Sequence, residues 1–175
     1  MKVLAFAASS SKQSINKALA NYAASLVDGA EVELLDINDY EMAIYSSDRE
    51  NESGIPLAAQ QFYQKISEAD AIVISFAEHN GSYTAAYKNL FDWTSRINMK
   101  VYQNKPMVLL ATSPGPGGAQ SVLNAAITSA PFFAADVKGS LSLPSFYDNF
   151  DLETQQMRSP EWLDKLATTM ASLTH

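Results

Sequence analysis

The sequence predicts a three-layer α/β fold in which five parallel strands form a doubly wound sheet between two layers of helices. Short apolar runs with β-branched residues alternate along the chain with segments whose apolar residues have helical spacing. The clearest run, at residues 71–77, has the composition of a strand buried on both faces of a parallel sheet. The 175 residues are sufficient for one core, so we expect a single domain over residues 1–175.

The first two strands are expected at residues 2–8 and 32–36. Between them, a helix over about 14–26 is predicted with Ser14 as its N-cap, because apolar residues recur on one helix face at Ile15, Leu19, Tyr22, Ala23 and Leu26.

Residues 37–56 form a polar connection that is longer than an ordinary link between a strand and a helix. Two interpretations stay open for it, a functional lid or a merely mobile loop. A helix over 57–69 then leads into the central strand, with Phe62, Ile66 and Ala69 facing inward.

The central strand is followed by a polar turn at 78–82 and by a helix that begins at Thr84, whose apolar face carries Ala86, Leu90, Trp93 and Ile97. Leu90, Phe91 and Trp93 are most simply core residues. An excess of apolar surface on this helix could also build a subunit interface.

The second half of the chain continues the alternation, with a strand, a glycine-rich turn, a helix and a weaker strand expected at residues 107–112, 113–118, 119–130 and 134–143. Pro144 should end the last strand because it has no N–H for the ladder. An irregular extension is expected at 144–159, and Pro160 opens a final helix. The expected strand order is 2-1-3-4-5, as in flavodoxin-like sheets.

Composition excludes several classes of function. The formal charge of −7 and the scattered distribution of the 12 basic residues argue against nucleic acid or an anionic membrane as a partner. The absence of cysteine excludes disulfides, thiolate metal sites and cysteine nucleophiles, and we expect no metal site. No apolar run has the length of a signal peptide or a membrane span, so we expect an unprocessed cytoplasmic protein.

Polar loops follow the first, third and fourth strands, at the sheet edge where open α/β sheets bind ligands. The first loop combines serines and an asparagine with a helix N-terminus, a set of neutral donors suited either to a phosphate or to plain capping of the turn. It contains no glycine, so the dinucleotide fingerprint is absent. Four of the seven glycines lie in the other two loops, where they allow close backbone approach or serve ordinary turns: Gly81, Gly115, Gly117 and Gly118.

Three stretches resemble motifs of the NADPH-dependent FMN reductases. Residues 8–16, ASSSKQSIN, are similar to the G-S-x-R-x-x-S-x-N loop of that family. Residues 77–82, AEHNGS, with the later pairs Lys88-Asn89 and Asp92-Trp93, resemble P-E-Y-N-x-S…L-K-N-x-x-D-W. Residues 113–118, SPGPGG, resemble the S-P-G-x-x-G-G turn. The resemblance covers roughly residues 3–125, with the motifs in order.

The chain departs from these motifs at four positions, where Ala8 replaces a glycine, Ser11 an arginine, Ala77 a proline and His79 a tyrosine. The loss of the arginine removes a bidentate contact to phosphate, and the neighbouring Lys12 offers a point charge instead.

The resemblance implies an enzyme that binds FMN and uses NADPH or NADH to reduce a small acceptor such as a quinone, free flavin or azo compound. It implies a phosphate site at Ser9, Ser11, Ser14, Ile15 and Asn16. It implies that the flavin ring is bordered by Ala77, Glu78, His79, Asn80, Gly81 and Ser82, and on its other edge by Ser113, Gly115, Gly117 and Gly118. We also expect a homodimer or homotetramer.

No side chain is expected to be catalytic, because hydride transfer to a flavin needs no acid or base from the protein. His79 is interpreted as a loop hydrogen-bonder and Glu78 as a solvated turn carboxylate.

The main alternative is a flavodoxin-like carrier that passes electrons to protein partners without NAD(P)H, a role that the acidity would suit. The glycine-rich turn at 113–118, which follows the fourth strand, favours the enzyme. A receiver-type regulatory domain would need acidic residues after the first strand, where this chain has alanine and serine.

Overall fold

The computed structural model describes all 175 residues and has one five-stranded parallel sheet with the order β2-β1-β3-β4-β5. The strands are β1 (Lys2–Ala8), β2 (Glu31–Leu35), β3 (Ala71–Phe76), β4 (Pro106–Thr112) and β5 (Asp136–Leu143). The predicted fold class and strand order are confirmed.

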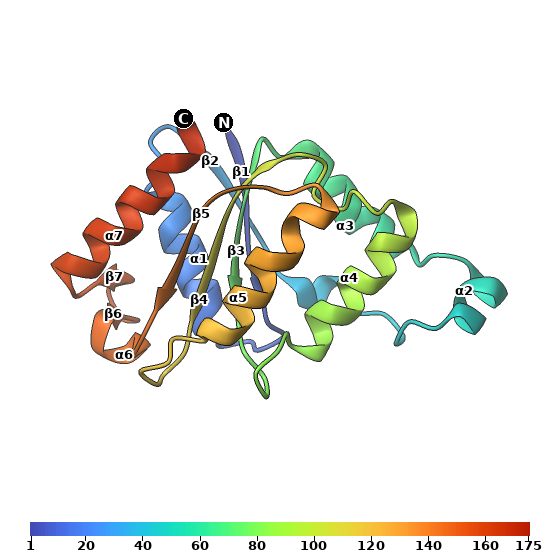
Figure 1. Cartoon of the computed structure of the whole chain (residues 1–175), viewed down its shortest axis with the longest axis horizontal. Helices are drawn as coiled ribbons and strands as arrows, with labels where there is room; N and C mark the ends of the chain where they lie inside the picture. The colour runs from blue at the N-terminus through green and yellow to red at the C-terminus, as the bar shows by residue number, and fades with distance from the viewer.

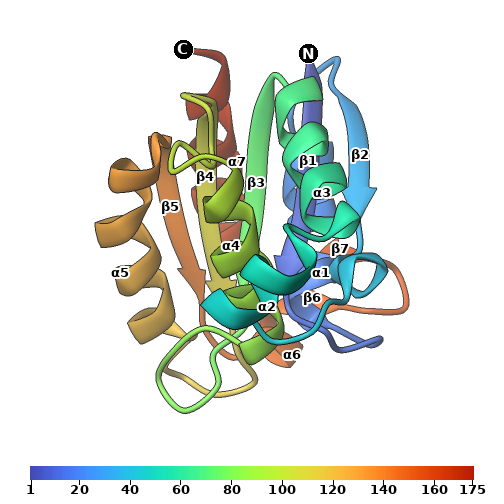
Figure 2. The ribbon, with the colours of Figure 1, turned by 90° about the vertical axis from the view of Figure 1, so that its right-hand side faces the viewer.

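Helices cover both faces of the sheet (Figure 1). One face packs against α1 (Ile15–Ser25) and α7 (Pro160–Ala171), and the other against α3 (Leu57–Glu68), α4 (Ala85–Ile97) and α5 (Gln120–Ser129). Figure 2 shows α4 between α3 and α5 in the second of these layers.

The strands build two cores because successive side chains point to opposite faces of the sheet. In β1, Leu4 and Phe6 belong to the cluster beneath α3, α4 and α5, whereas Val3 and Ala5 belong to the cluster beneath α1 and α7. Every residue of β3 is buried, as expected for the central strand.

Local signals at the helix ends also act as predicted. Ser14 caps α1 by accepting a hydrogen bond from the Lys17 N–H at 3.1 Å. Ser159 caps α7, which Pro160 opens. Strand β5 ends at Leu143, immediately before Pro144.

Residues 37–56 contain more structure than the sequence indicates, namely a 3-10 helix η1 (Ile37–Tyr40) and a short helix α2 (Ser47–Ser53). The side chain of Asn89 accepts from the Tyr45 N–H at 2.8 Å and donates to the carbonyls of Met42 and Ala43 at 3.2 and 3.1 Å. The Trp93 indole donates to the Ala43 carbonyl at 2.7 Å. The segment is therefore a strap hydrogen-bonded to α4, and Trp93 is both a core residue and one of its anchors.

The expectation of an irregular extension at 144–159 is wrong. A one-turn helix α6 (Phe146–Asn149) is followed by a small hairpin of β6 (Phe150–Asp151) and β7 (Gln156–Met157). Phe146 and Phe150 are buried and stack with ring centroids 4.9 Å apart. Such short elements have too few residues to show periodicity, so this contact gives no signal in the sequence.

The carboxyl ends of the strands, with their loops and α6, lie along the lower edge in Figure 1, and both termini lie at the opposite edge. Two further 3-10 segments are η2 (Ala130–Phe133) and η3 (Ser172–Thr174). None of the helices has the length and apolarity needed to cross a membrane.

Candidate active site

A cavity of about 260 Å³, here called the edge cleft, lies at the carboxyl ends of β1, β3 and β4. It brings together residues of all three predicted loops, namely Ser9, Ser11, Ser14, Ile15, Asn16, Ala77, Glu78, His79 and Ser113. Four further lining residues were not predicted: Gln13, Thr112, Pro114 and Tyr147. The remaining predicted positions, Asn80, Gly81, Ser82, Gly115, Gly117 and Gly118, do not line this cavity.

Serine hydroxyls organise the first loop. Ser9 accepts from the Ser11 N–H at 3.2 Å, and Ser11 accepts from the Gln13 N–H at 3.3 Å. A hydroxyl that accepts in this way still has its own O–H to donate. The first N–H groups of α1, those of Ile15 and Asn16, have no acceptor within the helix. The capping and phosphate interpretations are thus compatible, because the same loop can do both.

The side chain of Asn16 has a different role from the phosphate contact expected of it. It is 3% exposed, donates to the Thr112 carbonyl at 3.3 Å, and accepts from the Thr112 N–H at 3.1 Å and the Ser75 hydroxyl at 2.7 Å. These bonds join the start of α1 to the ends of β3 and β4. Asn16 therefore positions the loop, and its backbone N–H has no partner within the helix and can bind a ligand.

Glu78 is not a solvated turn carboxylate, contrary to the expectation from sequence. Its Oε1 accepts from the Val122 N–H at 2.8 Å, in the first turn of α5. That helix has no cap of its own, since its N-cap residue Ala119 provides no side-chain hydrogen bond. A carboxylate at a helix N-terminus is also favoured by the helix dipole. Glu78 thus links the loop after β3 to the first turn of α5, the helix that follows the loop after β4.

Residues 79–82 form a tight hairpin turn in which the His79 N–H donates to the Ser82 carbonyl at 3.0 Å, and the Ser82 N–H donates back at 3.1 Å. The two central residues, Asn80 and Gly81, have φ of 52° and 76°, which is the geometry that favours Asn-Gly. Turn chemistry therefore accounts for Gly81. His79 contributes to the loop through its backbone.

The glycines of the loop after β4 fall into two groups. Gly118 has φ of 60°, and a Cβ there would collide with Ser142 Oγ, so packing within the chain requires glycine. Gly115 and Gly117 have neither a positive φ nor any atom within 4 Å of an added Cβ. Nothing within the chain requires glycine at 115 or 117, and the predicted close approach to a ligand still accounts for them.

The unpredicted lining residues come from positions with weak local signals. Thr112 is the last residue of β4, where its hydroxyl donates to the Leu143 carbonyl at 2.6 Å, and the sequence suggested only a strand residue. Tyr147 is 55% exposed and reaches the cleft because Phe146 anchors α6 in the core. In the sequence, only the aromatic residues near it after Pro144, Phe146 and Phe150, indicate that this segment packs against the rest of the protein.

The charges near the edge cleft are few. Glu78 is the only acidic side chain that lines it, and His79 is the only basic one. Lys17 is engaged with Asp36 at 2.8 Å, and the hydrogen bond from Lys17 lowers the pKa of Asp36. Lys12 lies in the first loop and forms no ion pair. It is the nearest cation in sequence that is free to meet an anion held by this loop.

Residues 1–148 match the family described as NADPH-dependent FMN reductase. An NADPH:quinone oxidoreductase of Arabidopsis thaliana is 34% identical over 125 residues, which make up 69% of this chain and 62% of that protein. An NAD(P)H-dependent FMN reductase of Pseudomonas aeruginosa is 34% identical over 119 residues, or 67% of this chain and 63% of that protein. The match thus spans less than two thirds of the length of these curated relatives.

Among solved structures, the chain is similar to a flavoenzyme NAD(P)H:(acceptor) oxidoreductase of Paracoccus denitrificans, with a TM-score of 0.77 and 22% sequence identity. The superposition covers 98% of this chain and 94% of that one. At this identity the similarity concerns the fold, and it agrees with the flavodoxin-like strand order of the sheet.

Proposed function

The chain belongs to the family of NADPH-dependent FMN reductases, and from this premise we propose that it is an FMN-dependent enzyme that oxidises NADPH or NADH and reduces a small acceptor. The observation that carries the proposal is the convergence of the three family-like loops on one cleft at the carboxyl edge. We propose a quinone as the first acceptor to test, because one of the relatives is named as a quinone oxidoreductase, with free flavin and azo compounds as the alternatives.

The donors of the edge cleft fit a phosphate monoester. The hydroxyls of Ser9, Ser11 and Ser14 can donate, and the N-terminus of α1 adds N–H groups with partial positive charge. Lys12 adds a full charge beside them. The cavity of about 260 Å³ lies below the range of about 300–1,000 Å³ typical of whole-ligand pockets, so it suits the phosphate and ribityl chain better than an entire flavin.

The chain's own residues bind and orient in this proposal. FMN, when bound, supplies the redox chemistry by accepting a hydride and passing the electrons on. Asn16 holds the start of α1 against β3 and β4, and Glu78 connects the two segments proposed to border the ring. Because the Glu78 carboxylate is already engaged with α5, it is poorly placed to act as a proton carrier, which supports a reaction without acid–base side chains.

The same proposal includes the assembly of this chain into a homodimer or homotetramer. A flavodoxin-like electron carrier is the second candidate function, supported by the net charge of −7, which would suit docking to a basic partner protein.

The first experiment measures the binding of FMN and of riboflavin to the protein. Binding is detected as quenching of the flavin fluorescence. We expect Lys12→Gln to weaken FMN binding about threefold to tenfold and to leave riboflavin binding unchanged, since only FMN carries the charge. Lys100→Gln is the matched control, because Lys100 also forms no ion pair and lies at the opposite edge of the sheet. Equal affinity of the wild-type protein for the two flavins would contradict the phosphate site.

The second experiment is anaerobic titration of the FMN-loaded protein with NADPH and with NADH. Bleaching of the flavin absorbance, and its return when benzoquinone is added, is expected of the enzyme. A protein that binds FMN but is not bleached by either nucleotide would be a carrier instead.

A further inference from the structure

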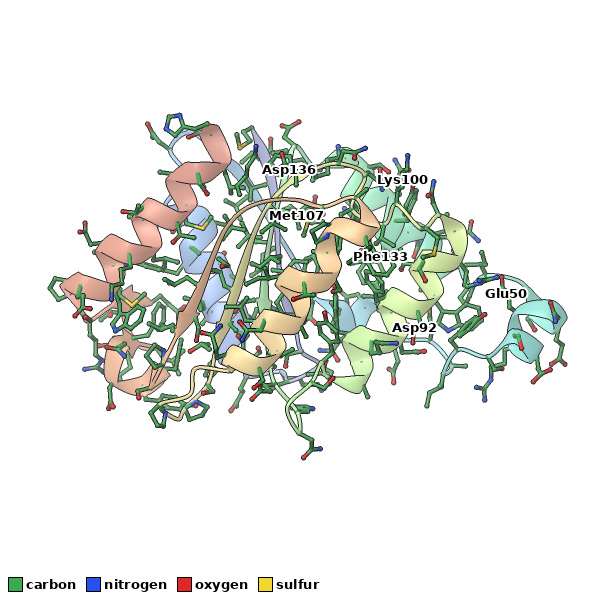
Figure 3. The ribbon with its side chains drawn as sticks, viewed as in Figure 1. Glu50, Asp92, Lys100, Met107, Phe133 and Asp136 are labelled. Atoms are coloured by element: carbon green, nitrogen blue, oxygen red, sulfur yellow. The ribbon has the colours of Figure 1, made fainter.

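Tyr147 is the only tyrosine that lines the edge cleft, and it comes from outside the three family-like loops, the last of which ends at residue 118. It belongs to α6, which follows β5 at the carboxyl edge of the sheet. Figure 3 labels Asp136, the first residue of β5, at the edge opposite to α6. The segment after β5 therefore adds a fourth wall to the cleft.

This wall is bonded to the loop after β4. The Ser145 N–H donates to the Gly115 carbonyl at 2.8 Å, and the Phe146 N–H donates to the Ser113 carbonyl at 3.0 Å. Both acceptors belong to the glycine-rich turn that is proposed to border the flavin ring. The residue that follows these two bonds in the chain is Tyr147, so its backbone position is tied to the site.

The turn of α6 itself is held from both sides. Phe146 is fully buried, and the Asn149 side chain donates to the carbonyls of Pro144 and Ser145 at 2.8 and 3.3 Å. Ser145 has a left-handed backbone with φ of 46°, which is uncommon for a residue other than glycine. Such conformations persist where the surrounding contacts hold them, and they cluster at ligand-binding sites. The fold thus presents Tyr147 at the cleft in a fixed place.

The hydroxyl of Tyr147 has no hydrogen-bond partner within the chain, and the side chain is 55% exposed. Four other tyrosine hydroxyls do form such bonds, namely those of Tyr45, Tyr83, Tyr87 and Tyr102. A phenolic O–H can donate to a phosphate oxygen, and a hydrogen bond to an anion is stronger than one between neutral groups.

The position of α6 relative to α1 brings this donor to the phosphate end of the cleft. Gln13 and Ser14, which precede α1, line the same cavity as Tyr147. Phe150, directly after α6, contacts Tyr22 of α1 edge to face, with ring centroids 5.5 Å apart. The segment therefore lies alongside the helix whose first N–H groups are proposed to bind the phosphate.

We propose that Tyr147 is a phosphate-binding residue of the FMN site and that its hydroxyl donates to the FMN phosphate. This rests on the proposed function and adds a donor to it. Tyr147 compensates in part for the arginine of the family motif, whose place Ser11 takes in this chain. Because riboflavin has no phosphate, the Tyr147 hydroxyl contributes to the preference for FMN over riboflavin.

The test is a fluorescence titration of the full-length protein with FMN and with riboflavin. We expect Tyr147→Phe to raise the dissociation constant of FMN about tenfold, the scale of one hydrogen bond to a charged group, and to change that of riboflavin by less than about twofold. The melting temperature of the flavin-free protein should not change, because the hydroxyl has no partner in the chain. Tyr63→Phe is the matched control, since Tyr63 is half-buried on α3, outside the cleft, and should have no effect on either flavin.

Tyr147→Ala separates the hydroxyl from the ring. It should weaken FMN binding at least as much as Tyr147→Phe does. Weaker FMN binding in Tyr147→Ala but not in Tyr147→Phe would show that the ring rather than the hydroxyl contacts the cofactor, and would overturn the phosphate role. Equal losses for FMN and riboflavin in Tyr147→Phe would overturn it as well.

The same titrations distinguish this inference from the proposed function. A wild-type protein that binds FMN, together with a Tyr147→Phe variant of unchanged FMN affinity, would refute the role of Tyr147 and leave the function intact. A wild-type protein that binds no FMN would refute the proposed function, and the role of Tyr147 with it.

Discussion

Replacing Glu78 with alanine should destabilise the protein, because it removes the only side-chain cap of α5. The bond from the Val122 N–H to Glu78 Oε1 is 2.8 Å long, and Glu78 is partly shielded from solvent. A hydrogen bond to a charged group contributes about 1.5–3 kcal/mol, and the favourable position at the helix N-terminus is part of that value. We therefore expect the free energy of unfolding to fall by about 2 kcal/mol.

The assay is urea unfolding of the FMN-free protein, followed by far-UV circular dichroism. In a domain of this size, a loss of about 2 kcal/mol lowers the melting temperature by about 4–8 °C. Glu78→Gln should lose less than Glu78→Ala, because its amide oxygen can still accept the bond from Val122. Glu153→Ala, an exposed carboxylate without an ion pair, is the control and should stay within about 0.5 kcal/mol of wild type.

A value for Glu78→Ala within about 0.5 kcal/mol of wild type would refute the capping role. The variant also has a functional readout that stability alone does not give. Glu78 connects the two segments proposed to border the flavin ring. Glu78→Ala should therefore change the visible absorption band of bound FMN, whereas Glu78→Gln should keep the band of the wild-type protein.

Three substitutions and one pH effect extend the test to the rest of the site. Asn16→Ala should reduce stability by about 2–4 kcal/mol in urea unfolding, since it leaves several buried partners unpaired, and a loss below about 1 kcal/mol would contradict this. Gly117→Val should leave the melting temperature unchanged but impair NAD(P)H oxidation, so a fully active variant would remove the proposed close approach. His79→Gln should keep most of the activity, whereas a general acid or base would contribute about 100- to 10,000-fold. The hydrogen bond from Lys17 lowers the pKa of Asp36, so the ionised Asp36 stabilises the folded protein at pH values above the ordinary carboxyl range. This stabilisation is lost as the pH falls below about 4. Asp36→Asn should therefore reduce the dependence of stability on pH in that range.

Local patterns in the sequence determined the architecture. The alternation of side chains in β1 and β3, the helical spacing in α1 and α4, and caps such as Ser14 depend on residues close together in the chain. The order of the units then defines the sheet edge at which the three loops meet, because parallel strands all end on the same side. These features suffice for the fold and for the position of the cleft.

The individual roles of side chains at the site were decided only by the tertiary structure. Glu78 and Val122 are 44 residues apart, and Asn16 and Thr112 are 96 apart. Such bonds depend on the relative placement of whole loops and helices, which no local pattern encodes. The same reason applies to Asn89, which holds the strap.

The approach of Tyr147 to the cleft, and the division between Gly118, required by packing, and Gly117, which has open space, are of the same kind. The sequence does not show whether a glycine or a tyrosine in a loop is exposed to solvent or packed against a strand that is distant in the chain. Periodicity determines which face of an element is buried, whereas the contacts of a loop residue are determined by elements that are remote in the chain and become neighbours only on folding.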